Sequence, residues 1–214
     1  AKYYAQCGAT SFAPASMTLP YDVLSKAFAT GKKLRDEAPE GYARFMGIQM
    51  EGPFFSYAKR GAQAADNLHK PDVALFDRLN AASGGMVKLV TVAVEEEGGL
   101  DFVANVSKKC TVSLGHTSAD YDQAMQAYAR GASHATHLYN GMPGYAHRSP
   151  GVIGAASDAG ASVELICDGL HIHPAAIRLA HKLYGDKLNL GGCELDMEAL
   201  SVDACVEEIA KLFA

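Results

Sequence analysis

The sequence lacks the patterns that mark several classes of protein. No run of 18 apolar residues occurs in it, so we expect no membrane-spanning segment. Its five cysteines include no C-x-x-C pair, which argues against a zinc ribbon or a disulfide framework and favours free thiols in a reducing cytoplasm. Lys and Arg number 19 against 24 Asp and Glu, and the net charge of -5 disfavours nucleic acid as a partner.

The sequence contains instead an alternation of short apolar runs and helical patterns. Hydrophobic residues make up 49% of the 214 residues, which is enough for a sizeable core. We predict strands at 9–13, 44–50, 87–94, 111–114, 134–138, 163–167 and 187–190. We predict helices at 21–37, 71–82, 100–109, 119–130 and 174–184.

Two of these helices carry clear local signals. Thr117 or Ser118 is expected to cap the start of the helix at 119–130. The helix at 174–184 opens with Pro174, which suits a first turn. Its predicted packing face consists of Ala176, Leu179, Ala180 and Leu183.

Repeated strand–helix units predict a parallel α/β fold. A doubly wound sheet and a (β/α)₈ barrel both satisfy the pattern. No G-x-G-x-x-G or G-x-x-x-x-G-K-[ST] follows a strand, which disfavours the nucleotide-binding doubly wound folds, and a repeat of roughly 25 residues suits a barrel. Because such barrels usually need about 250 residues, we expect residues 1–190 to form an incomplete barrel. Residues 191–214 are expected to form a C-terminal segment with an amphipathic helix that packs on the barrel.

Chemistry-bearing residues stand at the ends of several predicted strands. Glu51, His116 and His137 each follow an apolar run, and Asp168 and His171 follow another. The carboxyl ends of parallel barrel strands share one face, so these side chains are aimed at one cavity. Two His and one carboxylate around an open position form a catalytic metal geometry.

The alternatives differ in weight from residue to residue. A single strand-end His is more often a hydrogen-bonded structural residue than a ligand, but the joint placement favours the metal site. His134 and His137 are three residues apart, so we expect them on opposite strand faces, with His137 nearer the site. Arg148 suits an anion or a solvated loop, and Asn140 with Gly141 suits a hydrogen-bonded ligand or a turn.

In these motifs the sequence resembles the N-acetylglucosamine-6-phosphate deacetylases of the amidohydrolase superfamily. The resemblance lies in M-E-G-P-F with K-R-G-A-Q, then G-H-T-S-A, then T-H-L-Y-N-G-M with R-S-P-G, then D-G-L-H, in order from about Cys7 to Leu190. It implies a metal-dependent (β/α)₈ barrel that uses metal-bound hydroxide to convert N-acetylglucosamine 6-phosphate to glucosamine 6-phosphate and acetate. It also implies a cytoplasmic enzyme, commonly a homodimer.

The same resemblance implies roles for individual residues. Glu51, His116 and His137 would bind one divalent metal ion, most often zinc, and His171 would polarise or hold the N-acetyl carbonyl. The implied substrate-binding residues are Ala62, Gln63, Asn140, Gly141, Arg148, Asp168 and His171.

The sequence also departs from the family pattern. Gln63 stands where the family commonly has His. The family's first strand would precede Ala1, its small β-domain has no visible counterpart, and its catalytic Asp is not found after Leu190, where Gly191 and Gly192 follow. We therefore expect the first strand and the last-strand region to lie outside this sequence, and the Asp to be carried by an omitted segment. The alternatives are another amidohydrolase with a different amide substrate, or a non-catalytic relative that binds metal or sugar phosphate.

Overall fold

A parallel sheet of six strands forms the centre of the protein. The computed structural model describes residues 1–37 and 40–191. The strand order is the order in the sequence, so each strand lies beside the one that precedes it. The sheet consists of β3 (Ile48–Glu51), β4 (Val87–Val92), β5 (Thr111–Leu114), β6 (His134–Ala135), β7 (Ser162–Ile166) and β8 (Leu188–Gly191).

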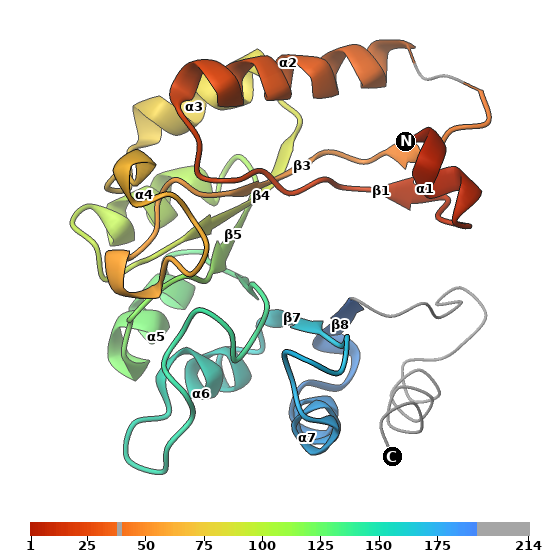
Figure 1. Ribbon diagram of the computed structural model, residues 1–214. Helices are drawn as coiled ribbons and strands as arrows, with labels where there is room; N and C mark the ends of the chain where they lie inside the picture. Colours follow the sequence, from red (N-terminus) through yellow and green to blue (C-terminus); the bar gives the residue numbers. More distant parts are fainter. Residues whose placement is uncertain (38–39, 192–214) are drawn as a thin grey trace.

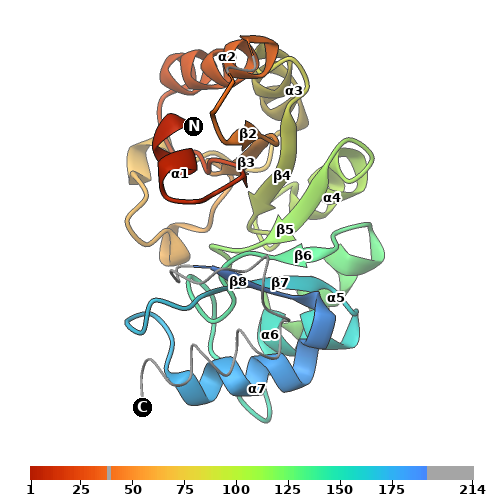
Figure 2. The ribbon, with the colours of Figure 1, turned by 90° about the vertical axis from the view of Figure 1, so that its right-hand side faces the viewer.

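One helix connects each pair of neighbouring strands. These are α3 (Val73–Ala82), α4 (Gly99–Val106), α5 (Tyr121–Ala129), α6 (Gly151–Asp158) and α7 (Pro174–Tyr184). The strands follow one another along an arc with the helices on its outer side (Figures 1 and 2). A doubly wound sheet would reverse its strand order and carry helices on both faces. The described part of the chain is therefore a curled, one-directional α/β half-barrel.

The segment before β3 adds a short neighbour to the sheet. The chain begins with α1 (Lys2–Gln6). Then β1 (Ser11–Phe12) pairs with β2 (Arg44–Phe45) in a separate two-stranded sheet, and α2 (Tyr21–Glu37) connects the two strands in the sequence. Pro14 to Ser16 then runs beside β3, where Ser16 N–H donates to the Gln49 carbonyl at 2.9 Å and Gln49 N–H donates to the Pro14 carbonyl at 3.0 Å.

Several boundaries differ from the sequence prediction for local reasons. The strand predicted at 44–50 is divided at Gly47 (φ 147°), where a Cβ would come within 2.8 Å of the Met86 carbonyl oxygen. The helix α6 was not predicted, because its Gly- and Ala-rich sequence carries little periodicity. The loop 52–70 holds two short 3₁₀ turns, Tyr57–Lys59 and Ala65–Asn67, and a third turn, Gly185–Lys187, precedes β8.

Two helix details correct the prediction. Asp120 caps α5 by accepting from Gln123 N–H at 2.8 Å, and the Gln123 side chain accepts from Asp120 N–H in return, so neither Thr117 nor Ser118 is the cap. The packing face of α7 was also wrong in part. It buries Ile177, Ala180 and Tyr184, whereas Leu179 and Leu183 are half-exposed.

The hydrophobic core lies between the outer face of the sheet and the helices. Residues that alternate along the strands point to this side and are fully buried, among them Met50, Val90, Val92, Val112, Leu114, Val163 and Leu165. From the helices, Phe76 and Phe102 pack edge to face with ring centroids 6.0 Å apart, and Phe54 lies 4.8 Å from Phe102. Each such side chain contributes about 1.5–3 kcal/mol through burial.

Two further points concern the extent of the chain. None of the helices in residues 1–37 and 40–191 has the length and hydrophobicity needed to cross a membrane. The predicted C-terminal amphipathic helix within 191–214 lies outside the described residues, apart from Gly191 at the end of β8.

Candidate metal centre

The inner face of the sheet is polar. Residues that pair across parallel strands share a face, and the register places Glu51 beside Thr91, Thr91 beside Ser113, and Ser113 beside His134. These side chains alternate with the apolar residues that pack against the helices. The concave side of the half-barrel therefore carries the groups that can do chemistry.

Two histidines reach this face through unusual backbone conformations. Strand alternation would send His116 outward with Leu114, and His137 outward with Ala135. Instead both residues have positive φ angles, 48° for His116 and 33° for His137. A non-glycine residue in this region costs on the order of 1–3 kcal/mol, and such residues cluster at functional sites. The left-handed turns direct both imidazoles over the carboxyl ends of the strands.

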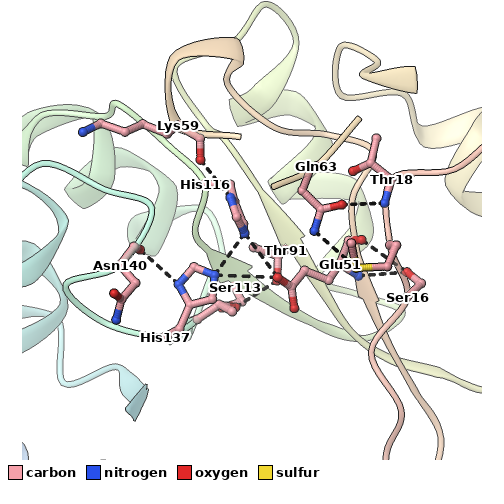
Figure 3. Close-up of polar contacts among 12 residues, drawn as sticks. Ser16, Thr18, Glu51, Lys59, Gln63, Thr91, Ser113, His116, His137 and Asn140 are labelled. Carbon is pink, nitrogen blue, oxygen red and sulfur yellow. Dashed lines mark hydrogen bonds and ion pairs between the residues drawn. The ribbon is translucent and has the colours of Figure 1, made fainter. Parts of the chain in front are cut away.

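The three predicted ligands, Glu51, His116 and His137, meet at this point (Figure 3). His116 Nε2 lies 3.2 Å from Glu51 Oε1 and 3.0 Å from His137 Nε2, and His137 Nε2 lies 3.7 Å from Glu51 Oε1. The residues come from the ends of β3, β5 and β6. A tetrahedral ion about 2.0–2.1 Å from each ligand would hold two ligands about 3.3 Å apart, so the spacing fits a small divalent cation.

The hydrogen bonds of the rings strengthen this fit. His116 Nδ1 donates to the Lys59 carbonyl at 2.8 Å, and His137 Nδ1 donates to the Asn140 carbonyl at 3.0 Å. In a neutral ring the proton is then on Nδ1, and Nε2 keeps its lone pair. Two such lone pairs 3.0 Å apart repel each other unless a cation or a proton lies between them. This pattern is the usual one for metal-ligating histidines.

Protons compete for the same position. Burial raises the pKa of Glu51, but hydrogen bonds with His116 and His137 outweigh burial and bring it to about 2. For His137, burial lowers the pKa, and the Glu51 carboxylate more than compensates, so the pKa is raised above its usual value. The carboxylate therefore stays ionised, and the His137 imidazole holds its proton more strongly when no cation is bound.

The remaining space around the rings is closely packed. Phe55 stacks on His116 with ring centroids 4.2 Å apart. A Cβ at Gly141 (φ +60°) would lie 3.2 Å from His137 Cε1 and 3.3 Å from His116 Nδ1. A side chain at the predicted site residue Gly141 would crowd both rings and strain the left-handed backbone, so the position favours glycine.

A hydrogen-bonded chain of buried hydroxyls lies beneath the three ligands. Thr136 Oγ1 lies 2.9 Å from Thr91 Oγ1 and 2.7 Å from Ser113 Oγ, and Ser113 Oγ lies 2.9 Å from His134 Nδ1. His134 Nε2 continues to Glu164 Oε1 at 3.7 Å. We call these residues the inner polar chain. It spans β4 to β7, directly below the metal-ligand candidates.

The inner polar chain corrects the argument about His134 and His137. Their odd spacing suggested opposite faces, but His134 lies on the inner face and the left-handed turn brings His137 to the same side. The choice of His137 as the ligand still agrees with the geometry, because only it lies beside Glu51 and His116. Burial lowers the pKa of His134 to about 4.

The other predicted residues lie in separate environments. Asn140 Nδ2 is buried without a hydrogen-bond partner in the described part of the chain. Gln63 is buried, and its Oε1 accepts from Thr18 N–H at 2.7 Å, whereas Ala62 is exposed. Thus Gln63 ties the loop 52–70 to the segment before α2.

Asp168 and His171 form their own unit after β7. The Asp168 carboxylate accepts from His171 Nδ1 at 2.7 Å and from the backbone N–H groups of Leu170 and His171 at 2.9 and 3.0 Å. The backbone hydrogen bonds, with the His171 ring, lower the pKa of Asp168 to about 2. His171 is exposed, as is Arg148 in the loop after β6.

Glu95 belongs to the same edge of the sheet but was not predicted from the sequence. Its carboxylate accepts hydrogen bonds from the Thr117 hydroxyl and from Ser118 N–H, directly after His116. Its position shortly after the end of β4 could have identified it, because the other candidate site residues also stand at strand ends. The run Glu95–Glu97 concealed it, because charge runs are usually solvated.

The described part of the chain is an α/β half-barrel, and a carboxylate and two imidazoles form a candidate metal site above the ends of its parallel strands. No protein-family model matches the chain. It is 39% identical over 177 residues to N-acetylglucosamine-6-phosphate deacetylase of Bacillus subtilis (strain 168), covering 81% of this chain and 45% of that protein. It is 36% identical over 183 residues to N-acetylgalactosamine-6-phosphate deacetylase of Escherichia coli O157:H7, covering 84% and 48%.

Solved structures agree with the sequence matches. A mutant N-acetyl-D-glucosamine-6-phosphate deacetylase from Mycobacterium smegmatis, in complex with N-acetyl-D-glucosamine-6-phosphate, superimposes with a TM-score of 0.82 at 30% identity, covering 88% of this chain and 49% of that one. In sequence and in structure the chain is therefore a relative of the N-acetylglucosamine-6-phosphate deacetylases. It spans about half the length of the curated relatives it matches.

Proposed function

We propose that this chain is the metal-binding part of an enzyme that hydrolyses the N-acetyl group of N-acetylglucosamine 6-phosphate to glucosamine 6-phosphate and acetate. The observation that carries the proposal is the convergence of Glu51, His116 and His137 at the strand ends, in a chain related to these deacetylases. For the whole protein we propose a complete (β/α)₈ barrel, because six strands already follow one another in order along the arc.

Glu51, His116 and His137 would hold one divalent ion, and zinc is the proposed metal. Two imidazole nitrogens and a carboxylate oxygen are common zinc donors, and three protein ligands leave a position free for water or substrate. When bound, such an ion would acidify water and polarise an amide carbonyl. The chain's own contribution is to fix the donors through the Lys59 and Asn140 carbonyls.

His171 is the proposed partner of the acetyl carbonyl. The Asp168 carboxylate holds its Nδ1–H, which leaves Nε2 free to face a substrate. Asp168 thus orients the ring. Both residues follow β7, at the same edge of the sheet as the metal ligands.

The substrate contacts are proposed from the loop after β6. The buried Asn140 Nδ2 has no partner within the described residues and suits a sugar or amide oxygen beside Gly141. The exposed Arg148 suits the phosphate, because a guanidinium binds phosphate oxygens in bidentate fashion. Ala62 and Gln63 complete the proposed set. Gln63 Oε1 is occupied as the acceptor of Thr18 N–H, so Gln63 would contact a substrate through its amide nitrogen. That nitrogen lies 3.8 Å from Met17 Sδ.

The metal site is tested by binding and the reaction by turnover. Purified chain, stripped of metal, is titrated with zinc, and full-length protein is assayed with N-acetylglucosamine 6-phosphate before and after chelation. We expect stoichiometric zinc in the wild type and loss of it in His116→Ala and His137→Ala. Full zinc retention in both variants would refute the site.

N-acetylgalactosamine 6-phosphate is the second candidate substrate. It is favoured by the 36% identity to the Escherichia coli deacetylase of that name. The two sugars differ at one hydroxyl, so kcat/KM measured with each decides between them. If the protein hydrolyses neither sugar phosphate but does hydrolyse an unrelated amide, a different amidohydrolase activity is favoured.

Arg148 provides a separate test of the phosphate. Removal of a charged hydrogen-bond donor costs about 1.5–3 kcal/mol, so Arg148→Ala should raise KM for the phosphorylated sugar at least about tenfold. The unphosphorylated sugar should be affected little. Equal losses on both sugars would instead assign Arg148 a structural role.

A further inference from the structure

Strand β4 lies between two strands that carry ligand candidates. β3 ends at Glu51 and β5 leads into His116, whereas β4 places no side chain in the described triad. Beyond its end, however, Glu95 reaches the residues that follow His116. We propose that Glu95 is a positioning residue that holds His116 in its left-handed conformation and so presents His116 Nε2 to the metal. This inference rests on the metal site proposed above.

Glu95 contacts the turn after His116 at two points. The two carboxylate oxygens of Glu95 accept from two consecutive residues, the Thr117 hydroxyl and Ser118 N–H. Hydrogen bonds to an ionised carboxylate are stronger than neutral ones, and a two-point contact fixes orientation as well as distance. These hydrogen bonds thereby fix the backbone immediately after His116.

The Thr117 hydroxyl uses Glu95 as its hydrogen-bond acceptor. Thr117 is fully buried, and its Oγ1 accepts from Ala119 N–H at 3.1 Å. The hydroxyl proton therefore points away from Ala119, and the hydroxyl donates a hydrogen bond to the Glu95 carboxylate. A buried hydroxyl that lost this acceptor would be left with an unsatisfied donor.

The other hydrogen bonds of this turn come from different loops. Ser56 N–H donates to the His116 carbonyl at 2.9 Å, and Thr117 N–H donates to the Gly141 carbonyl at 3.0 Å. These bonds join His116 to the loops after β3 and β6. Glu95 adds the loop after β4 and supplies the negative charge among these contacts.

The neighbouring carboxylates offer a matched control. Glu97 is exposed and pairs with Lys70 at the surface, away from the His116 turn. It lies in the same loop and has the same charge as Glu95. A loss that is merely electrostatic, through attraction of the cation at a distance, would appear in both Glu95 and Glu97 variants.

The experiment uses the full chain, stripped of metal, in wild-type, Glu95→Ala, Glu95→Gln and Glu97→Ala forms. Zinc dissociation constants are measured by competition with a chelator, and the visible spectrum of the cobalt(II) form reports the ligand geometry. We expect Glu95→Ala to weaken zinc binding about 10–100-fold, the usual effect of losing a group that orients a metal ligand. Glu95→Gln should recover part of the loss, because its amide oxygen still accepts from Ser118. Glu97→Ala should match the wild type.

A second variant addresses folding. Thr117→Val removes one donor of the same contact without removing the carboxylate. If Glu95 acts through this contact, the losses in zinc affinity of Glu95→Ala and Thr117→Val should not add in the double variant. Additive losses would overturn the inference, even if Glu95→Ala alone folds poorly.

The outcomes separate the inference from the proposed function. If the wild type binds zinc and Glu95→Ala binds it equally well with an unchanged cobalt spectrum, the positioning role is refuted and the metal site stands. If the wild-type chain binds no zinc, the metal site is refuted, and the inference with it.

Discussion

The two faces of the central sheet follow different rules. The outer face consists of regularly alternating apolar residues such as Met50, Val90 and Leu114. They pack on the helices through non-directional hydrophobic contacts. The inner face, with Glu51, Thr91 and Thr136, depends on hydrogen bonds between specific atoms. The outer face therefore tolerates any apolar residue of suitable volume, whereas the inner face needs particular groups at particular positions.

The comparison shows where stability and chemistry are separated. Outer-face residues stabilise the chain without touching the ligands. Inner-face residues contribute less apolar burial, and two ligands adopt backbone conformations that cost free energy. Substitutions at Leu79, His134 and Thr136 test this division.

The largest effect is expected in the core on the outer side. Leu79 of α3 is fully buried, so Leu79→Ala should lower the free energy of unfolding by about 2–5 kcal/mol. Leu179→Ala on α7, where the side chain is 54% exposed, is the control and should cost far less. Denaturant unfolding measures both. The division would fail if Leu79→Ala weakened zinc binding in the folded fraction as strongly as loss of a ligand.

The second effect concerns pH and His134. Its folded pKa of about 4 lies below its usual 6.5, so the unfolded chain binds the proton more readily. Stability is therefore fully present above pH 6.5 and falls as the pH decreases towards 4, by about 3 kcal/mol in total.

The His134→Gln variant isolates this contribution. Burial raises the pKa of neighbouring Glu164, which acts in the opposite sense, but Glu164 is present in both proteins. The difference in unfolding free energy between wild type and variant should thus shrink or reverse between pH 6.5 and 4. A constant difference would show that His134 does not titrate in this way.

The smallest effect is expected at Thr136. Thr136→Val removes the hydroxyl that joins Thr91 and Ser113, at a cost of about 1–3 kcal/mol. Thr111→Val at the exposed start of β5 is the control and should stay within about 0.5 kcal/mol. Because Thr91→Val removes the partner as well, the double variant should cost less than the sum. Full additivity would mean that the inner polar chain does not act as a network.

The sequence predicted the outer face better than the inner one. Apolar runs and helix signals located the strands and α2 to α5, because periodicity reflects burial directly. Sequence patterns failed where contacts with neighbouring elements determine which residues are buried. The exposed Leu179 and Leu183 satisfy helical spacing as well as the buried Ile177 does.

For the site, strand-end position identified Glu51, His116 and His137, but not how the histidines reach it. Their left-handed turns depend on contacts with distant loops, which no local pattern encodes. The same holds for Thr117, which resembles a helix cap but binds Glu95. The partner of Gln63 also lies 45 residues away in the chain.

Gly141 has a consequence for how such a site can change over evolutionary time. A Cβ added at Gly141 would lie 3.2 Å from His137 Cε1 and 3.3 Å from His116 Nδ1, and the Gly141 carbonyl accepts from Thr117 N–H at 3.0 Å, so one residue links the loops of both candidate ligands. A substitution there disturbs both ligands together, and neither can be adjusted alone. Substitutions should therefore be tolerated further along the same loop, as at the exposed Tyr145, more readily than at its stem.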